Sequence, residues 1–155
     1  MTVPRSVTIA TVEDELPAVT AYAQRHDWAV NWDTEQIRLT FDGKHPADAT
    51  PIRIVAAVEG YKALPPAWTF EDPAGKRAIF PKAGSVNGKS SIFHQGRHRI
   101  CAPFNRLAYG QHGGPHSDWG GPERWLEVRG HIRATTLANM LASILGHLKA
   151  SPGVC

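Results

Sequence analysis

Cys101 is the residue of this sequence that most suggests chemistry. The chain has two cysteines, and Cys155 is its last residue, where chain ends are usually mobile. Cys101 is interior and follows Arg97, His98 and Arg99 closely. Positive groups lower the pKa of a thiol, and the thiolate is its nucleophilic form. These neighbours are compatible with a reactive cysteine, but Ile100 and Ala102 beside it favour, on local composition alone, a buried cysteine that packs as a small hydrophobe.

Histidines on both sides of Cys101 offer a second kind of chemistry. They are His94, His98, His112 and His116. Imidazole and thiolate are the usual ligands of zinc, so these four residues and Cys101 form a candidate metal site. Paired Cys-x-x-Cys spacing is absent, and the glycines after His112 argue against a helix that would place two histidines on one face.

His116 is followed two residues later by Asp118, which suggests acid–base chemistry. A histidine beside a carboxylate can act as a general base, or the segment can simply form a turn. Cys101, His116 and Asp118 are also the residue types of a hydrolase triad. The sequence around Cys101 lacks the strand–turn–helix pattern of a nucleophile elbow, and no phosphate-binding glycine loop is present.

The elements that must position these residues follow from periodicity. Residues 14–26 predict a helix with Thr11 near its start, Pro17 in its first turn and one apolar face. Alternating or continuous apolar runs predict strands at residues 28–32, 37–41, 52–58 and 68–70, a turn at 42–46, and a further short strand at 77–80. This order predicts an antiparallel meander after the helix.

The second half of the chain holds a long irregular segment followed by a predicted helix. Residues 81–122 are rich in glycine, and such long irregular segments are often functional. A broad apolar stripe predicts a helix at 135–149, capped by Thr135 or Thr136 and stopped by Pro152 and Gly153. We therefore expect a single α+β domain over residues 1–155, with the last helix packed on the sheet.

Composition excludes several classes of protein. Hydrophobic residues make up 42% and charged residues 20%, as in folded globular proteins. The net charge is +3, but the basic residues are spread along the chain, so we expect no nucleic-acid partner. No apolar run is long enough to cross a bilayer, and the N-terminal residues soon turn acidic. We therefore expect no membrane partner and a cytoplasmic location.

The order of motifs resembles the ubiquitin-conjugating enzyme family over about residues 14–150. The run Gly60-Tyr61-Lys62-Ala63-Leu64-Pro65-Pro66 resembles the family's Tyr-Pro-x-x-Pro-Pro segment, with Lys62 in place of the first Pro. His94 ahead of Ile100-Cys101 resembles the family's His-Pro-Asn … Ile-Cys-Leu segment. Trp119 and Trp125 then precede a helix that resembles the family's central helix.

The resemblance implies a role for Cys101. In the family, the corresponding cysteine accepts the C-terminus of a ubiquitin-like protein as a thioester from an activating enzyme, and an amine of a protein target then attacks it. His-Pro-Asn is incomplete here, and Asn105 is the candidate to replace its Asn. His94, His116 and Asp118 are further candidates for supporting roles, and no cofactor is implied.

Two departures point to a subgroup of the family. The family's last two helices have no counterpart, and the glycine-rich stretch 110–121 is longer than in the family. Both resemble divergent bacterial proteins from ubiquitin-like conjugation operons, which implies antiphage defence. A non-catalytic binding module of the same fold and a His/Cys metal-binding protein remain the alternatives.

Overall fold

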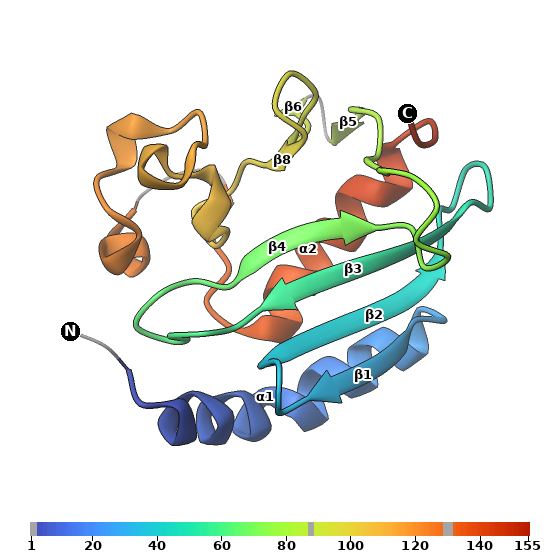
Figure 1. Ribbon diagram of the computed structural model, residues 1–155. Helices are drawn as coiled ribbons and strands as arrows, with labels where there is room; N and C mark the ends of the chain where they lie inside the picture. Colours follow the sequence, from blue (N-terminus) through green and yellow to red (C-terminus); the bar gives the residue numbers. More distant parts are fainter. Residues whose placement is uncertain (1–2, 87–88, 129–131) are drawn as a thin grey trace.

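The computed structural model describes residues 3–86, 89–128 and 132–155, which form an α+β fold (Figure 1). Helix α1 (Arg5–Arg25) comes first and helix α2 (Leu137–Ala150) comes last. Between them the main strands are β1 (Ala29–Asp33), β2 (Arg38–Lys44), β3 (Pro51–Ala57) and β4 (Ala67–Glu71). Over the described residues, neither helix combines the length and the apolar character that crossing a bilayer requires.

The four main strands form an antiparallel meander in the order β1-β2-β3-β4. Helix α2 lies across one face of this sheet, while α1 packs beside β1 and against α2 (Figure 1). The core lies between the sheet and α2, and its residues alternate along the strands. Its fully buried members include Leu39, Phe41, Ile52, Ile54, Leu137, Met140, Leu141 and Ile144. The predicted meander and the helix packed on it are confirmed.

Short elements fill the irregular segment beyond the free edge of β4 (Figure 1). They are β5 (Ser85–Val86), β6 (Lys89–Ser90), β7 (Phe93–His94), β8 (Arg99–Ile100), and the 3-10 helices η1 (Arg106–Ala108), η2 (Gly110–His112), η3 (Ser117–Trp119) and η4 (Pro122–Glu127). Strand β5 pairs with β6, and β7 pairs with β8. The segment predicted to be irregular is therefore a chain of short turns and bridges.

The start of the first helix differs from the prediction. Helix α1 begins at Arg5, whereas the sequence placed its start at residue 14. Thr11 does not cap the helix, because its hydroxyl donates to the carbonyl of Val7 at 2.8 Å from within the helix. Thr8 and Val12 are buried and extend the inner face by two turns towards the N-terminus. Pro17 accordingly lies inside the helix and not in its first turn.

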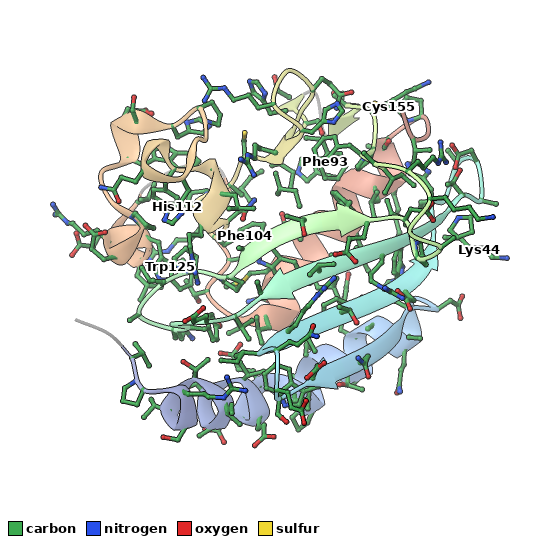
Figure 2. The ribbon with its side chains drawn as sticks, viewed as in Figure 1. Lys44, Phe93, Phe104, His112, Trp125 and Cys155 are labelled. Carbon is green, nitrogen blue, oxygen red and sulfur yellow. The ribbon has the colours of Figure 1, made fainter. Side chains whose placement is uncertain are left out.

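Two other local predictions are wrong. Strand β2 continues through Lys44, so the turn begins at His45 and not at residue 42. Residues 77–80 form no strand. Instead Phe80 packs its ring edge-to-face against Phe70 and Phe93, with centroids 5.6 and 5.9 Å away. These three rings pack the irregular segment against β4, in place of the short strand predicted at 77–80. Phe93 is labelled in Figure 2.

The last helix is capped as predicted. The hydroxyl of Thr136 accepts a hydrogen bond from the backbone N–H of Asn139 at 3.2 Å.

Beyond the C-terminus of α2, the hydroxyl of Ser151 lies 2.9 Å from Nε2 of His45, which is fully buried in the β2–β3 turn. The backbone N–H of Ala47 donates to Nδ1 of His45 at 3.0 Å. Because Nδ1 accepts, His45 is neutral with its proton on Nε2.

Because His45 is buried and neutral, we expect the protein to lose stability in acid. Burial lowers the pKa of His45 below its usual 6.5, and the opposing effect of Asp48 is smaller. Burial also lowers the pKa of His147. Below about pH 6.5 the unfolded chain takes up protons that the folded chain does not, so the free energy of unfolding falls as pH falls.

Urea unfolding at several values between about pH 7.5 and about pH 5 measures this effect. The variant His45→Gln is expected to show a shallower fall over the same range, because the buried imidazole of His45 is then no longer there to take up a proton on unfolding. An equal slope in wild type and variant would contradict the assignment to His45.

Candidate active site

Cys101 directly follows β8, at the end of the β7–β8 hairpin. Its backbone N–H donates to the carbonyl of Ile92 at 2.6 Å, and the hairpin pairs Phe93 with Ile100. The side chains of Phe93 and Ile100 are buried in the core, whereas Cys101 is half-buried. The hairpin therefore presents Cys101 at the boundary between the core and solvent.

A cavity of about 410 Å³ lies over Cys101. Four of the five candidate catalytic residues line it together: His94, Cys101, His116 and Asp118. The other lining residues are Ser90, Ser91, Ile92, Pro103, Trp119 and Ile132. Residues from the β7–β8 hairpin and from η3 meet here although they are separated by up to two dozen positions. The tertiary structure thus brings most of the predicted residues into one site.

Burial controls the chemistry of the Cys101 thiol. The guanidinium groups of Arg97 and Arg99 lower its pKa, in the direction that the sequence indicated. Burial in the cavity acts more strongly and raises the pKa of Cys101 to about 11. The thiol is therefore protonated at neutral pH in the free protein, and forming the thiolate requires a proton acceptor or a change of environment.

His116 is held by its neighbours on three sides. Its ring stacks on that of Trp119, with centroids 3.7 Å apart and planes 3° from parallel. Its Nδ1 lies 3.6 Å from an Asp118 carboxylate oxygen. Its backbone N–H donates to the carbonyl of Ala108 at 3.0 Å, and its carbonyl accepts from the N–H of Gly110 at 3.1 Å. The His–Asp pair predicted from sequence is therefore present, and it faces the same cavity as Cys101.

His94 lines the cavity from the β7–β8 hairpin and accepts a hydrogen bond at a ring nitrogen, as His116 does not within the described residues. Its Nδ1 accepts a hydrogen bond from the backbone N–H of Arg97 at 3.2 Å. The neutral ring must then carry its proton on Nε2, so that atom is a hydrogen-bond donor. His94 is thus suited to donating a hydrogen bond to an oxygen in the cavity.

Asn105 does not line the cavity, although the sequence placed it among the site residues. It is fully buried, and its amide oxygen accepts from the N–H of Trp68 at 2.8 Å and from that of Leu107 at 3.2 Å. Its amide nitrogen donates to the carbonyls of Ile100 at 2.8 Å and Trp68 at 3.3 Å. Both of its N–H groups are therefore used, and Asn105 supports the segment around Cys101 without presenting a donor to the cavity.

The candidate metal set does not come together. His98 stacks on Phe80, with ring centroids 5.0 Å apart, and lines a different cavity. His112 is exposed at the end of η2, among the 3-10 helices (Figure 2). In the described parts of the chain, no three His, Cys, Asp or Glu side chains are grouped so that they hold a metal ion.

The segment with the Tyr-x-x-x-Pro-Pro pattern lies against the irregular segment. Arg106 donates from its backbone N–H to the carbonyl of Pro66 at 3.0 Å and from its side chain to the carbonyl of Pro65 at 3.1 Å. The indole N–H of Trp125 donates to the carbonyl of Lys62 at 3.1 Å, and the Tyr61–Lys62 peptide bond is cis. Two of the motifs that carry the family resemblance therefore contact each other, through Trp125 and Lys62.

Sequence reasoning missed Ser90, Ser91 and Ile132 as residues of the site. Polar and apolar residues of these types are common in every loop, so no local signal marks them. They reach the cavity only because the β7–β8 hairpin folds back and the chain entering α2 passes beside it.

Comparisons with protein-family models, with curated proteins and with solved structures found no match to this chain. The chemistry of the site must therefore be argued from its geometry. That geometry is a half-buried cysteine in a cavity that also holds two histidines and a carboxylate.

Proposed function

We propose that this protein is a ubiquitin-like protein conjugating enzyme that works through Cys101. The observation that carries the proposal is the shared cavity of Cys101, His94, His116 and Asp118. Nucleophilic catalysis needs a thiol that a partner can reach, with a group nearby that can take its proton. This cavity supplies both in an α+β fold whose motifs follow the order found in that family.

The proposed reaction has two steps. The Cys101 thiolate attacks the carbonyl carbon of a thioester between an activating enzyme and the C-terminus of a ubiquitin-like protein, and the activating enzyme's thiolate leaves. A thioester on Cys101 results. An amine of a protein target then attacks that carbonyl, an amide forms as the amine gives up a proton to water, and the Cys101 thiolate leaves. The resemblance to bacterial operon proteins extends the proposal to antiphage defence in the cytoplasm.

A second candidate is a non-catalytic binding module of the same fold. The high pKa of Cys101, about 11, favours this candidate because a protonated thiol is a poor nucleophile. The two candidates differ in whether a covalent bond to Cys101 ever forms. A binding module would retain the ubiquitin-like protein with Cys101 replaced, whereas a conjugating enzyme would lose its adduct.

The test is adduct formation with an activating enzyme, ATP and a ubiquitin-like protein from the same source. We expect an adduct on non-reducing gels that a thiol reagent removes, because thioesters exchange with thiols. Cys101→Ser should lose this thiol-sensitive adduct, since the serine hydroxyl is a weaker nucleophile and its ester resists thiols. Cys155→Ser, at the other and exposed cysteine, is the matched control and should keep it.

Two outcomes would count against the proposal. A thiol-sensitive adduct that persists in Cys101→Ser would place the chemistry elsewhere. Binding of the ubiquitin-like protein without any adduct in the wild type would favour the binding module.

A further inference from the structure

We propose that His116 is the base that takes the proton from the Cys101 thiol, with Trp119 and Asp118 holding its ring, and that His94 does not share this role. The inference rests on the proposed function and assigns a catalytic residue within the same site. It follows from the positions of the two histidines around one cavity and from the hydrogen bonds that each already makes.

His116 has a ring nitrogen that is free to accept a proton. Neither of its ring nitrogens makes a hydrogen bond to any residue in the described part of the chain. The Trp119 stack fixes the plane of the ring, and the two backbone hydrogen bonds to Ala108 and Gly110 fix its position. A base held in this way loses little conformational freedom when it acts, which is what efficient proton transfer requires.

Asp118 attracts this ring from one side and helps to orient it. Its carboxylate oxygen lies 3.6 Å from Nδ1 of His116, which leaves Nε2 as the nitrogen for exchange with the cavity. Asp118 has a side chain 77% exposed, so water weakens the attraction and the carboxylate assists the base without being essential. We therefore expect a smaller effect from removing Asp118 than from removing His116.

His94 is not arranged to act as the base. Its Nδ1 accepts the N–H of Arg97, so the neutral ring has its proton on Nε2 and offers no free lone pair to the cavity. The other charged groups that act on Cys101 are Arg97 and Arg99, which are permanently protonated and cannot accept a proton. Of the two histidines that line the cavity, His116 is the one whose ring nitrogens make no hydrogen bond within the described residues.

The proton of the Cys101 thiol moves to Nε2 of His116, which gives a thiolate and an imidazolium. The thiolate forms a bond to the carbonyl carbon of the donor thioester, and the bond from that carbon to the donor sulfur breaks. The departing thiolate takes the proton from the imidazolium, so His116 returns to its neutral form. No oxidant, reductant or metal is needed.

The experiment measures alkylation of Cys101 by iodoacetamide, followed by mass spectrometry from about pH 6 to about pH 11. Near neutral pH we expect His116→Gln to slow alkylation of Cys101 about tenfold, and Asp118→Asn to slow it about threefold. The rates should converge near the pKa of the thiol, about 11, where the thiolate forms without help from a base. The exposed Cys155 reports the intrinsic rate in the same sample.

Convergence at high pH separates loss of a base from disruption of the cavity, because a misfolded site would alter the rate at every pH. Asp118→Asn is a second safeguard, since so exposed a side chain contributes little to folding. His112→Gln, at an exposed histidine outside the cavity, is the matched control and should leave the profile unchanged. Equal profiles for His116→Gln and wild type, or a larger loss in His94→Gln, would overturn the assignment.

A failure of this assignment can be told apart from a failure of the proposed function. A wild type that forms the thiol-sensitive adduct, together with an unchanged His116→Gln profile, would leave the conjugating function standing and remove His116 from it. A His116-dependent profile without any adduct would leave a base-assisted cysteine whose reaction is of another class.

Discussion

Asn105→Ala is expected to lower the free energy of unfolding by about 3 kcal/mol, because four hydrogen bonds of a buried amide are lost together. The amide of Asn105 pairs with both the N–H and the carbonyl of Trp68, as a neighbouring strand would. Strand β4 is the edge of the sheet, and its backbone groups need partners there. After the substitution, the N–H of Trp68 would lose its partner in the core, and the carbonyl of Ile100 would keep the longer bond from the N–H of Ala102 at 3.2 Å.

The same substitution should also reduce chemistry at Cys101. Asn105 binds the carbonyl of Ile100, the residue directly before Cys101, so its loss releases the segment that positions the thiol. Urea unfolding followed by tryptophan fluorescence measures the stability change, and adduct formation measures the effect on the site.

Two further variants sharpen this prediction. Asn105→Asp keeps the shape and the acceptors but removes the N–H donors, so it should be at least as destabilising as alanine. Asn139→Ala is the matched control, because Asn139 is exposed on α2 and should change stability by less than about 0.5 kcal/mol. A loss of less than about 1 kcal/mol in Asn105→Ala would mean that water replaces the amide.

Glu15→Ala is the second substitution with a large expected effect, again about 3 kcal/mol of unfolding free energy. One carboxylate oxygen of Glu15 accepts from the hydroxyl of the fully buried Tyr61 at 2.8 Å and lies 3.7 Å from the Lys62 ammonium. The other accepts from the backbone N–H of Leu137 at 2.6 Å. Leu137 is the first residue of α2, where a negative charge also stabilises the helix dipole.

The carboxylate of Glu15 thus joins three elements distant in sequence: α1, the loop after β3 and the start of α2. Removing it leaves a buried hydroxyl and a helix N–H without partners, whereas Glu15→Gln keeps one acceptor oxygen and should cost about half as much. Asp14→Ala, at the exposed neighbouring residue on the same helix, is the matched control and should be nearly neutral. Equal stability of Glu15→Ala and Asp14→Ala in urea would contradict this role.

The chain entering the first helix shows where sequence patterns mislead. Thr11 followed by acidic residues is typical of a helix start, yet these residues lie within a helix that begins at Arg5. The same threonine hydroxyl can cap a helix or bond to a carbonyl one turn earlier, and only packing decides between them. Thr8 and Val12 are buried against the rest of the protein, and this burial favours the longer helix.

The histidines show a different limit of sequence reasoning. Spacing alone made His94, His98, His112 and His116 equal candidates as metal ligands. The fold separates them, because His98 stacks on Phe80 and His112 faces solvent, while His94 and His116 enter the cavity. Even these two differ in their hydrogen bonds, since Nδ1 of His94 accepts from the backbone N–H of Arg97.

The sequence by itself determined the main elements and their order: a first helix, four strands, an irregular segment and a final helix capped by Thr135 or Thr136. These features are local, because periodicity and capping act over one or two turns of chain. The tertiary structure alone decided the state of Cys101. Its raised pKa comes from burial, and its support comes from Asn105, whose amide binds Trp68, 37 residues away in the sequence. Both depend on contacts between distant segments, which no local pattern encodes.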